Sequence, residues 1–267
     1  MLIMMRGAGD IASGIALRLY HAGFSVVMTD ISKPTSIRRT VCFSEAIYNG
    51  TQLVEDVEGV LATSVAEIKA ILAQGKIAVA VDPEAKLAQA LQPVVLIDAI
   101  LAKRNLGTTL SMAPFVIGVG PGFTAGIDCH AVVETMRGHT LGRVIRSGSA
   151  LPNTNIPGLI GGFAGERVLR APDDGVFCPL KEIGDTVQAG ETVATVNGKP
   201  MTATISGTLR GLLRAGVTVT AKMKSGDVDP RGDAAYCRLV SDKALAVGGG
   251  VLEAVMGFLS ENRDYSF

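Results

Sequence analysis

The stretch that decides the fold runs over residues 2–30, LIMMRGAGDIASGIALRLYHAGFSVVMTD. It begins with an apolar run that breaks at Gly7, continues with apolar residues at helical spacing, and ends in a second apolar run that closes on Asp30. A strand, a glycine turn, a helix and a strand in this order predict a βαβ unit, whose two strands lie parallel in one sheet. Because the same alternation continues to about residue 97, we expect an α/β fold with a Rossmann-like parallel-sheet domain.

The turn after the first apolar run fits the dinucleotide-binding fingerprint G-x-G-x-x-A, with Gly7, Gly9 and Ala12 at its fixed positions. In this fingerprint the first glycine permits a tight turn, the second lets a phosphate approach the backbone, and the small third residue lets the helix pack on the strand. Asp30 lies 21 residues after Gly9, where a carboxylate can accept a hydrogen bond from a ribose hydroxyl. These four residues are therefore predicted to bind a nucleotide. The alternative is a βαβ turn that keeps its glycines for geometry.

A second glycine loop follows the apolar run at residues 115–119 and reads G-x-G-P-G, with Gly118, Gly120 and Gly122. Consecutive backbone N–H groups in such a loop can form a concavity that binds an anion. We expect this loop to hold a second phosphate or another anionic group.

Titratable side chains gather just after this loop, where two of the three histidines lie within ten residues. Such a cluster beside a glycine loop is a candidate reactive or anion-binding site, and a hydrogen-bonded turn between two strands is the alternative. The four cysteines are far apart and form no C-x-x-C pair, so we expect no metal site. The candidate catalytic residues are His130, Glu134, Arg137 and His139.

Residues 171–228 superpose on themselves at a shift of 32 residues, which places Gly175 on Gly207 and Val187 on Val219. The segments IGDTVQAGETV at 183–193 and ISGTL at 205–209 resemble the biotinyl and lipoyl carrier modules, which fold as a barrel-sandwich hybrid. The resemblance implies a small all-β module, and it implies Lys199, near the tip of the central hairpin, as a cofactor-carrying lysine. The Met-Lys-Met and Asp-Lys-Ala motifs of such carriers are absent, so we favour a structural module.

Three segments are expected. Residues 1–170 form the Rossmann-like nucleotide-binding domain with its second glycine loop, residues 171–228 form the β-module, and residues 229–267 form a C-terminal helix that packs back on the first domain. The triple glycine at 248–250 within this last helix could bind an anion, but close packing is the favoured explanation.

Charge and composition exclude several classes of partner. The 25 basic residues balance the 25 acidic ones, and there are only 8 Phe, 4 Tyr and no Trp, which argues against nucleic-acid and membrane-surface partners. The first apolar run stops at Arg6 and is too short for a signal peptide, so we expect a cytoplasmic protein.

Taken together, the residues resemble the YqeB-type accessory proteins of the selenium-dependent molybdenum hydroxylase system. The segments that carry the resemblance are IMMRGAGDIASGIALRL, VCFSEAIYNG, VLIDAILAKRNLGTT, VIGVGPGFTAGIDCHAVVETMRGHTLGRVI, SGTLRGLLRAG and GDVDPRGDAAYC. The glycine turn is also similar to that of the XdhC-type molybdenum cofactor chaperones. The resemblance implies a bacterial factor that helps mature a molybdenum hydroxylase, with the hydroxylase apoenzyme as partner and molybdopterin dinucleotide as the cofactor handled.

An alternative function is that of an NAD(P)-dependent oxidoreductase. Asp30 would then favour NAD over NADP by repelling a 2′-phosphate. The absence of a clear proton donor paired with a substrate-binding arginine argues against this alternative, and both catalysis and oligomeric state stay open.

Overall fold

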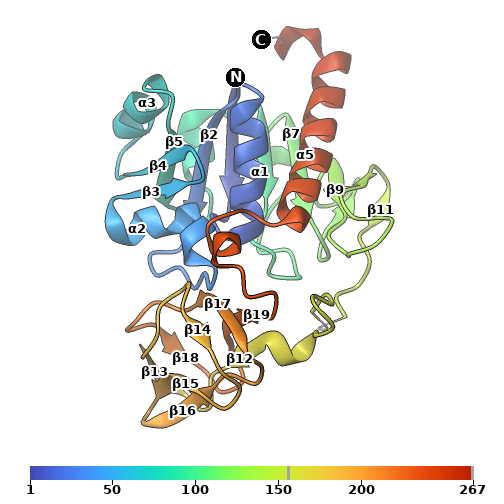
Figure 1. Ribbon diagram of the computed structural model, residues 1–267. Helices are drawn as coiled ribbons and strands as arrows, with labels where there is room; N and C mark the ends of the chain where they lie inside the picture. The colour runs from blue at the N-terminus through green and yellow to red at the C-terminus, as the bar shows by residue number, and fades with distance from the viewer. Residues whose placement is uncertain (155–156, 266–267) are drawn as a thin grey trace. The chain divides into compact units, whose positions relative to one another are not determined.

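The computed structural model describes residues 1–154 and 157–265. The chain divides into two compact units (Figure 1). Unit 1 consists of Met1–Pro34, Cys42–Asn153 and Val240–Phe267, and unit 2 of Thr35–Val41 and Thr154–Leu239. The predicted segments 1–170, 171–228 and 229–267 stay a prediction of domain organisation.

Over the described residues, unit 1 is built on a nine-stranded sheet with the order β10-β9-β7-β6-β1-β2-β5-β4-β3. The pairs in its middle are parallel, whereas β3 with β4 and β9 with β10 are antiparallel. Short strands β8 and β11 pair separately. The strands are β1 (Leu2–Arg6), β2 (Ser25–Asp30), β3 (Thr51–Val54), β4 (Val57–Ala62), β5 (Ile77–Val81), β6 (Val95–Asp98), β7 (Phe115–Val119), β8 (Thr124–Ala125), β9 (Ala131–Val133), β10 (Val144–Ile145) and β11 (Gly148–Ser149).

Two long helices of unit 1, α1 (Asp10–His21) and α5 (Asp242–Glu261), lie side by side (Figure 1). Their close approach needs small residues, because a Cβ at Gly14 would lie 2.5 Å from the Cβ of Ala244. Among the described helices, α5 is long and apolar enough to cross a membrane by length and composition, but half of its apolar window is buried within the structure, as in a core helix. The shorter helices are α2 (Ala46–Asn49), α3 (Val65–Ala73) and α4 (Leu87–Leu91).

In the described part of unit 2, eight strands form two antiparallel four-stranded sheets, β12-β19-β17-β14 and β16-β15-β13-β18. Their apolar side chains, including Phe177, Leu209 and Val228, share one buried cluster. The strands are β12 (Val168–Arg170), β13 (Gly175–Pro179), β14 (Thr186–Val187), β15 (Thr192–Val196), β16 (Lys199–Thr202), β17 (Gly207–Leu212), β18 (Thr218–Val219) and β19 (Lys224–Asp229). Single 3-10 turns complete both units: η1 (Arg39–Val41), η2 (Phe43–Glu45), η3 (Leu110–Met112), η4 (Gly165–Arg167), η5 (Ala234–Cys237) and η6 (Arg263–Tyr265).

The 32-residue repeat is visible in the strand pairing of unit 2. Gly175 of β13 pairs with Val219 of β18, and the equivalent residues Gly207 of β17 and Val187 of β14 pair in the same way. The long strand of each half therefore pairs with the short strand of the other half: β13 pairs with β18, and β17 pairs with β14.

The predicted fold class, a Rossmann-like parallel sheet plus a barrel-sandwich-hybrid-like module, is wrong. The described chain is a mixed α/β structure with one large mixed sheet and three antiparallel sheets. The parallel order ends at both edges because the chain doubles back there. At one edge β3 and β4 form a hairpin whose turn places Glu55 in the left-handed region, with φ 54°. At the other edge β10 returns antiparallel to β9.

Candidate functional site

The candidate site lies at the carboxyl ends of the parallel strands of unit 1. In the sheet, β1 has β2 on one side and β6 on the other, so the order of the strands reverses at β1. Open α/β sheets bind their ligands in the crevice at such a reversal, outside the carboxyl ends of the strands. The residues that close β1, β2 and β6 here are Arg6, Asp30 and Asp98.

Arg6 is almost completely buried at this point and holds several segments together. Its Nη1 lies 3.2 Å from Asp98 Oδ2 and 2.5 Å from Thr108 Oγ1, and its Nη2 donates to the carbonyl oxygens of Pro83 and Leu106 at 2.9 and 3.1 Å. Thr108 in turn donates to Asp98 at 2.6 Å. Among the described residues, the buried Arg6 Nε has no hydrogen-bond partner. This Nε–H is thus a buried donor that the described residues leave unsatisfied, whereas Nη1 and Nη2 are both engaged.

Asp30 closes the glycine turn from the end of β2. Its Oδ2 accepts a hydrogen bond from the backbone N–H of Ala8 at 2.9 Å, and its Oδ1 accepts from Ile31 at 2.8 Å. Burial raises the pKa of this carboxyl, against the effect of these two hydrogen bonds. A carboxylate has about four acceptor positions, so Asp30 can still accept from a ligand hydroxyl.

The other fingerprint residues have distinct structural roles. Gly7 has a φ of 98°, and a Cβ there would lie 2.8 Å from the carbonyl oxygen of Ala99. Gly9 is the N-cap of α1, and among the described residues no side chain caps it by a hydrogen bond. Ala12 is buried within α1. The N-terminal amides of α1 are thus left to the backbone, to water or to a ligand.

A small cavity of about 130 Å³, which we call the pit, opens among these residues. The charged residues that line it are Arg6, Asp30 and Asp82. Its rim is apolar, since Ile31 and Leu106 are 44% and 43% exposed. An apolar surround with a few placed polar groups is typical of small-molecule sites. The full lining is Arg6, Gly7, Thr29, Asp30, Ile31, Asp82, Pro83, Ile100 and Leu106.

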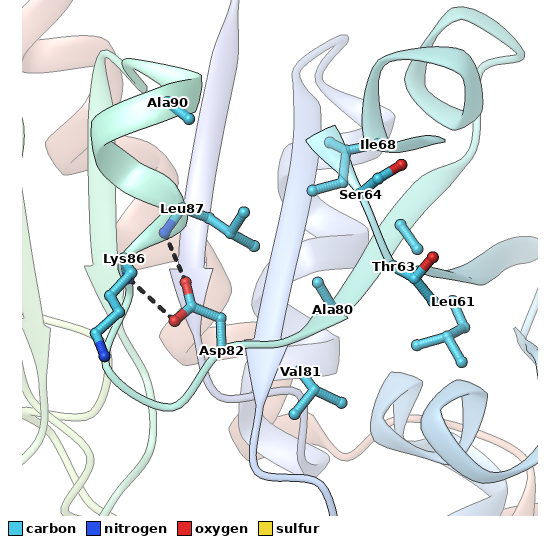
Figure 2. Close-up of a pocket in the computed structure, with 11 residues that line it drawn as sticks. Leu61, Thr63, Ser64, Ile68, Ala80, Val81, Asp82, Lys86, Leu87 and Ala90 are labelled. Atoms are coloured by element: carbon cyan, nitrogen blue, oxygen red, sulfur yellow. Dashed lines mark hydrogen bonds between the residues drawn. The ribbon is translucent and has the colours of Figure 1, made fainter. Parts of the chain in front are cut away.

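A second cavity of about 490 Å³, which we call the side cavity, lies above β4 and β5 (Figure 2). Figure 2 shows α4, with Leu87 and Ala90, on one side and the start of α3, with Ser64 and Ile68, on the other. Asp82 lines both cavities, and its carboxylate accepts from the backbone N–H groups of Lys86 and Leu87 at 3.0 and 2.8 Å. The full lining is Leu61, Ala62, Thr63, Ser64, Ile68, Ala80, Val81, Asp82, Lys86, Leu87 and Ala90.

The loop that contributes Ile100 and Leu106 to the pit is strained. Leu101 and Lys103 adopt left-handed backbone conformations with φ of 60° and 63°. The Asn105 side chain ties the loop by accepting from the Thr108 N–H at 2.7 Å and donating to the Thr108 carbonyl at 2.8 Å. Strain of this kind in residues other than glycine is concentrated at functional sites.

The second glycine loop is filled by neighbouring groups. A Cβ at Gly118 would lie 2.4 Å from the Phe123 ring, and a Cβ at Gly122 would lie 2.6 Å from the backbone of Arg104. The Gly120 N–H donates to the carbonyl of Val133 at 2.8 Å. Close packing therefore accounts for these glycines, and anion binding by the loop stays a prediction.

The four candidate catalytic residues have separate partners. His130 Nδ1 accepts from the Val116 N–H at 2.9 Å, and burial lowers its pKa. Glu134 is 2% exposed. Glu134 accepts from the N–H groups of Thr135, Met136 and Leu151 at 2.7, 2.7 and 2.8 Å, and Arg137 pairs with Asp242 at 2.8 Å. The residue His139 is exposed, and its backbone carbonyl, not its ring, accepts from Arg143 Nε.

Lys199, the lysine implied by the carrier resemblance, begins β16 beside the Asn197-Gly198 turn. Its Nζ lies 2.8 Å from Asp173, and its side chain is 61% exposed. The Lys199 side chain thus forms a partly exposed ion pair with Asp173. Attachment of a cofactor to this lysine stays a prediction.

Sequence reasoning missed three charged residues of the site, Arg6, Asp82 and Asp98. Each is a charged residue at the end of an apolar run, in LIMMR, IAVAVD and VLID. A charge that interrupts a buried parallel strand at its carboxyl end is a signal that could have identified them.

Comparison with known proteins gives a curated relative with high sequence identity and structural neighbours with low similarity. No protein-family model matches the chain. The solved structures that were found include an aspartoacylase family protein from Mesorhizobium loti, at 11% identity over 85% of this chain and 83% of that chain with a TM-score of 0.25. They also include a succinylglutamate desuccinylase/aspartoacylase from Rhodobacter sphaeroides, at 14% identity over 86% and 88% with a TM-score of 0.24. These scores are too low to argue a shared fold.

Over 255 residues, or 96% of its length, the chain is 52% identical to the Escherichia coli K12 protein described as uncharacterized protein YqeB. The match covers 47% of that relative, so the chain spans about half the length of the curated protein it matches. This similarity supports the resemblance to YqeB-type proteins across nearly the whole chain.

Proposed function

We propose that the chain is an accessory factor in the maturation of a molybdenum hydroxylase, of the selenium-dependent kind, and that unit 1 binds the ribose of the enzyme's nucleotide-containing cofactor in the pit. The observation that carries the binding proposal is Asp30. Its carboxylate is held by the Ala8 N–H at the end of β2 and lines the pit. The maturation role rests on the resemblance to YqeB-type proteins, and the proposed partner is the hydroxylase apoenzyme.

The charges of the pit favour hydroxyl groups over phosphates. Asp30 and Asp82 both line it, and carboxylates accept hydrogen bonds from ribose hydroxyls but repel phosphate oxygens. A pyrophosphate would instead need the N-terminal amides of α1 at Gly9.

The size of the pit leads to the same assignment. At about 130 Å³ it is smaller than the roughly 300–1,000 Å³ of pockets that enclose a whole small-molecule ligand. A sugar-sized group fits it, and a complete dinucleotide does not.

The test is calorimetric titration of the purified protein with molybdopterin dinucleotide, NAD and ATP, combined with mass spectrometry of the ligand that co-purifies from the native host. The Asp30→Asn variant should bind the dinucleotide at least about tenfold more weakly. The control is Asp56→Asn, a change in an exposed side chain that lines neither cavity. Equal affinity of the wild type and Asp30→Asn, or no binding of any of the three nucleotides, would overturn the proposal.

The maturation role has its own test, the activity of the molybdenum hydroxylase in host cells whose own copy of the protein is replaced by a variant. Cells that carry Asp30→Asn should produce hydroxylase protein with reduced activity and reduced cofactor content, and cells that carry Asp56→Asn should match the wild type. Full hydroxylase activity in cells without the protein contradicts the role.

A further inference from the structure

The side cavity is larger and more apolar than the pit, and the proposal above leaves it without a role. Its volume of about 490 Å³ lies inside the range of small-molecule pockets. Its walls come from aliphatic side chains on two helices and two strands. These are Leu61, Ala62, Ile68, Ala80, Val81, Leu87 and Ala90.

A few polar groups are placed on these apolar walls. Ser64 Oγ accepts from the Glu67 N–H at 3.2 Å, and as the acceptor in that bond it keeps a hydroxyl hydrogen that it can donate. Asp82 lies at the α4 side of the cavity and reaches the pit as well (Figure 2). The two cavities therefore share one lining residue, Asp82.

We propose that the side cavity binds a planar heteroaromatic ring, such as a purine, and that this ring is the far end of the ligand whose sugar occupies the pit. The second half of this statement rests on the proposed function, whereas the ring site rests on the cavity itself. Aliphatic walls complement the faces of a flat ring, and ring nitrogens and exocyclic amines complement the Ser64 hydroxyl and the Asp82 carboxylate. An acyl chain would fill the aliphatic walls but would use neither the Ser64 hydroxyl hydrogen nor the remaining acceptor positions of the Asp82 carboxylate, so it is the poorer occupant.

The ring site is tested directly with adenosine, which carries no phosphate, by methyl NMR of the full chain. A bound aromatic ring shifts the methyl resonances that it contacts. Adenosine should shift the methyl signals of Leu61, Ile68 and Leu87 and leave those of Leu209 and Leu212, in the core of unit 2, unchanged. If saturating adenosine leaves the three cavity methyl groups unshifted, the ring site is wrong.

A matched pair of variants separates the ring site from the pit. Ala90 and Ala70 are both exposed alanines on helices, but only Ala90 lines the side cavity. Ala90→Phe fills the cavity and should weaken adenosine and dinucleotide binding at least about tenfold, whereas Ala70→Phe should leave both affinities unchanged.

The outcomes distinguish the two proposals. If Asp30→Asn weakens dinucleotide binding and Ala90→Phe does not, the ring site is wrong and the pit assignment stands. If Ala90→Phe weakens adenosine binding while Asp30→Asn leaves dinucleotide binding intact, the ring site stands and the sugar assignment is wrong. Equal thermal unfolding of Ala90→Phe and Ala70→Phe confirms that the difference arises in binding.

Discussion

The Asp30 carboxylate accepts a hydrogen bond from the backbone N–H of Ala8, 2.9 Å away, and so joins the end of β2 to the turn between β1 and α1. This N–H is one of the donors that a phosphate would use in the dinucleotide fingerprint. Because the Asp30 carboxylate engages this N–H, the proposed ligand would meet a carboxylate rather than a free amide at this point of the turn.

Asp30→Asn should be at least as stable as the wild type at neutral pH. Burial raises the pKa of Asp30 above its ordinary value of 3.8, so the folded chain retains a proton that the unfolded chain has lost. The free energy of unfolding therefore falls as the pH rises from about 4 through the folded pKa, and the ionised group opposes folding at neutral pH. Asparagine keeps an oxygen for the Ala8 N–H and removes the charge. Urea unfolding at several pH values should show this pH-dependent loss in the wild type only, and the same loss in Asp30→Asn contradicts the assignment.

The βαβ unit at residues 2–30 could be predicted because each of its elements carries its own period in the sequence. The structure confirms β1, α1 and β2 there. The hairpin of β3 and β4 could not be predicted, since its turn at Glu55 has neither glycine nor asparagine and uses a left-handed conformation of a residue that disfavours it. The 32-residue repeat could be recognised in the sequence because its glycines recur. The pairing of strands between its two halves depends on tertiary structure, which the repeat pattern does not specify.

The site was predictable only where one local motif contains it. Gly7 and Asp30 belong to one fingerprint, and both line the pit. The Arg6–Asp98 pair joins residues 92 positions apart, and no local pattern specifies that these two meet. His130 and Glu134 are close in sequence, yet each is taken up by backbone N–H groups, because a buried acceptor binds the nearest donor that folding leaves unsatisfied.

Arg6→Met should destabilise unit 1 strongly. Its partner Asp98 is 1% exposed, and removal of the guanidinium leaves this carboxylate buried without its cation. We expect a loss of about 3–5 kcal/mol in the free energy of unfolding. Adding Asp98→Asn should recover part of the loss, because it removes the uncompensated charge.

The comparison for Arg6 is Arg137→Met. Arg137 pairs with Asp242 in a bridge whose side chains are 36% and 77% exposed. Such a pair contributes about 0–1 kcal/mol, so this variant should unfold at nearly the wild-type urea concentration. Equal effects of the two substitutions would show that burial of the Arg6 pair is not what makes it important.

Alanine substitutions at two adjacent glycines of α5 should change the free energy of unfolding in opposite directions. A Cβ at Gly250 would lie 1.9 Å from the carbonyl oxygen of Gly142, so Gly250→Ala should lower the free energy of unfolding by about 1–3 kcal/mol. At Gly249 no described atom lies within 4 Å of an added Cβ, and Gly249→Ala should raise it by about 1 kcal/mol through helix propensity. Thermal unfolding of both variants checks this, and shifts of the same sign would contradict close packing as the reason for the glycine run.

The last prediction concerns His130, whose neutral ring accepts the Val116 N–H at 2.9 Å. Burial lowers the pKa of this histidine below its ordinary value of 6.5, so the unfolded chain takes up a proton at a pH where the folded chain does not. The free energy of unfolding should therefore fall as the pH drops from about 6.5 through the folded pKa. In His130→Asn the amide oxygen accepts the same N–H and the slope from this group disappears. His130→Ala also removes the slope but, at pH values where the wild-type ring is neutral, lowers stability by about 1 kcal/mol, since it offers no acceptor. Urea titrations between pH 5 and pH 8 distinguish the three proteins, and an identical slope in all of them would show that the ring nitrogen does not hold this strand.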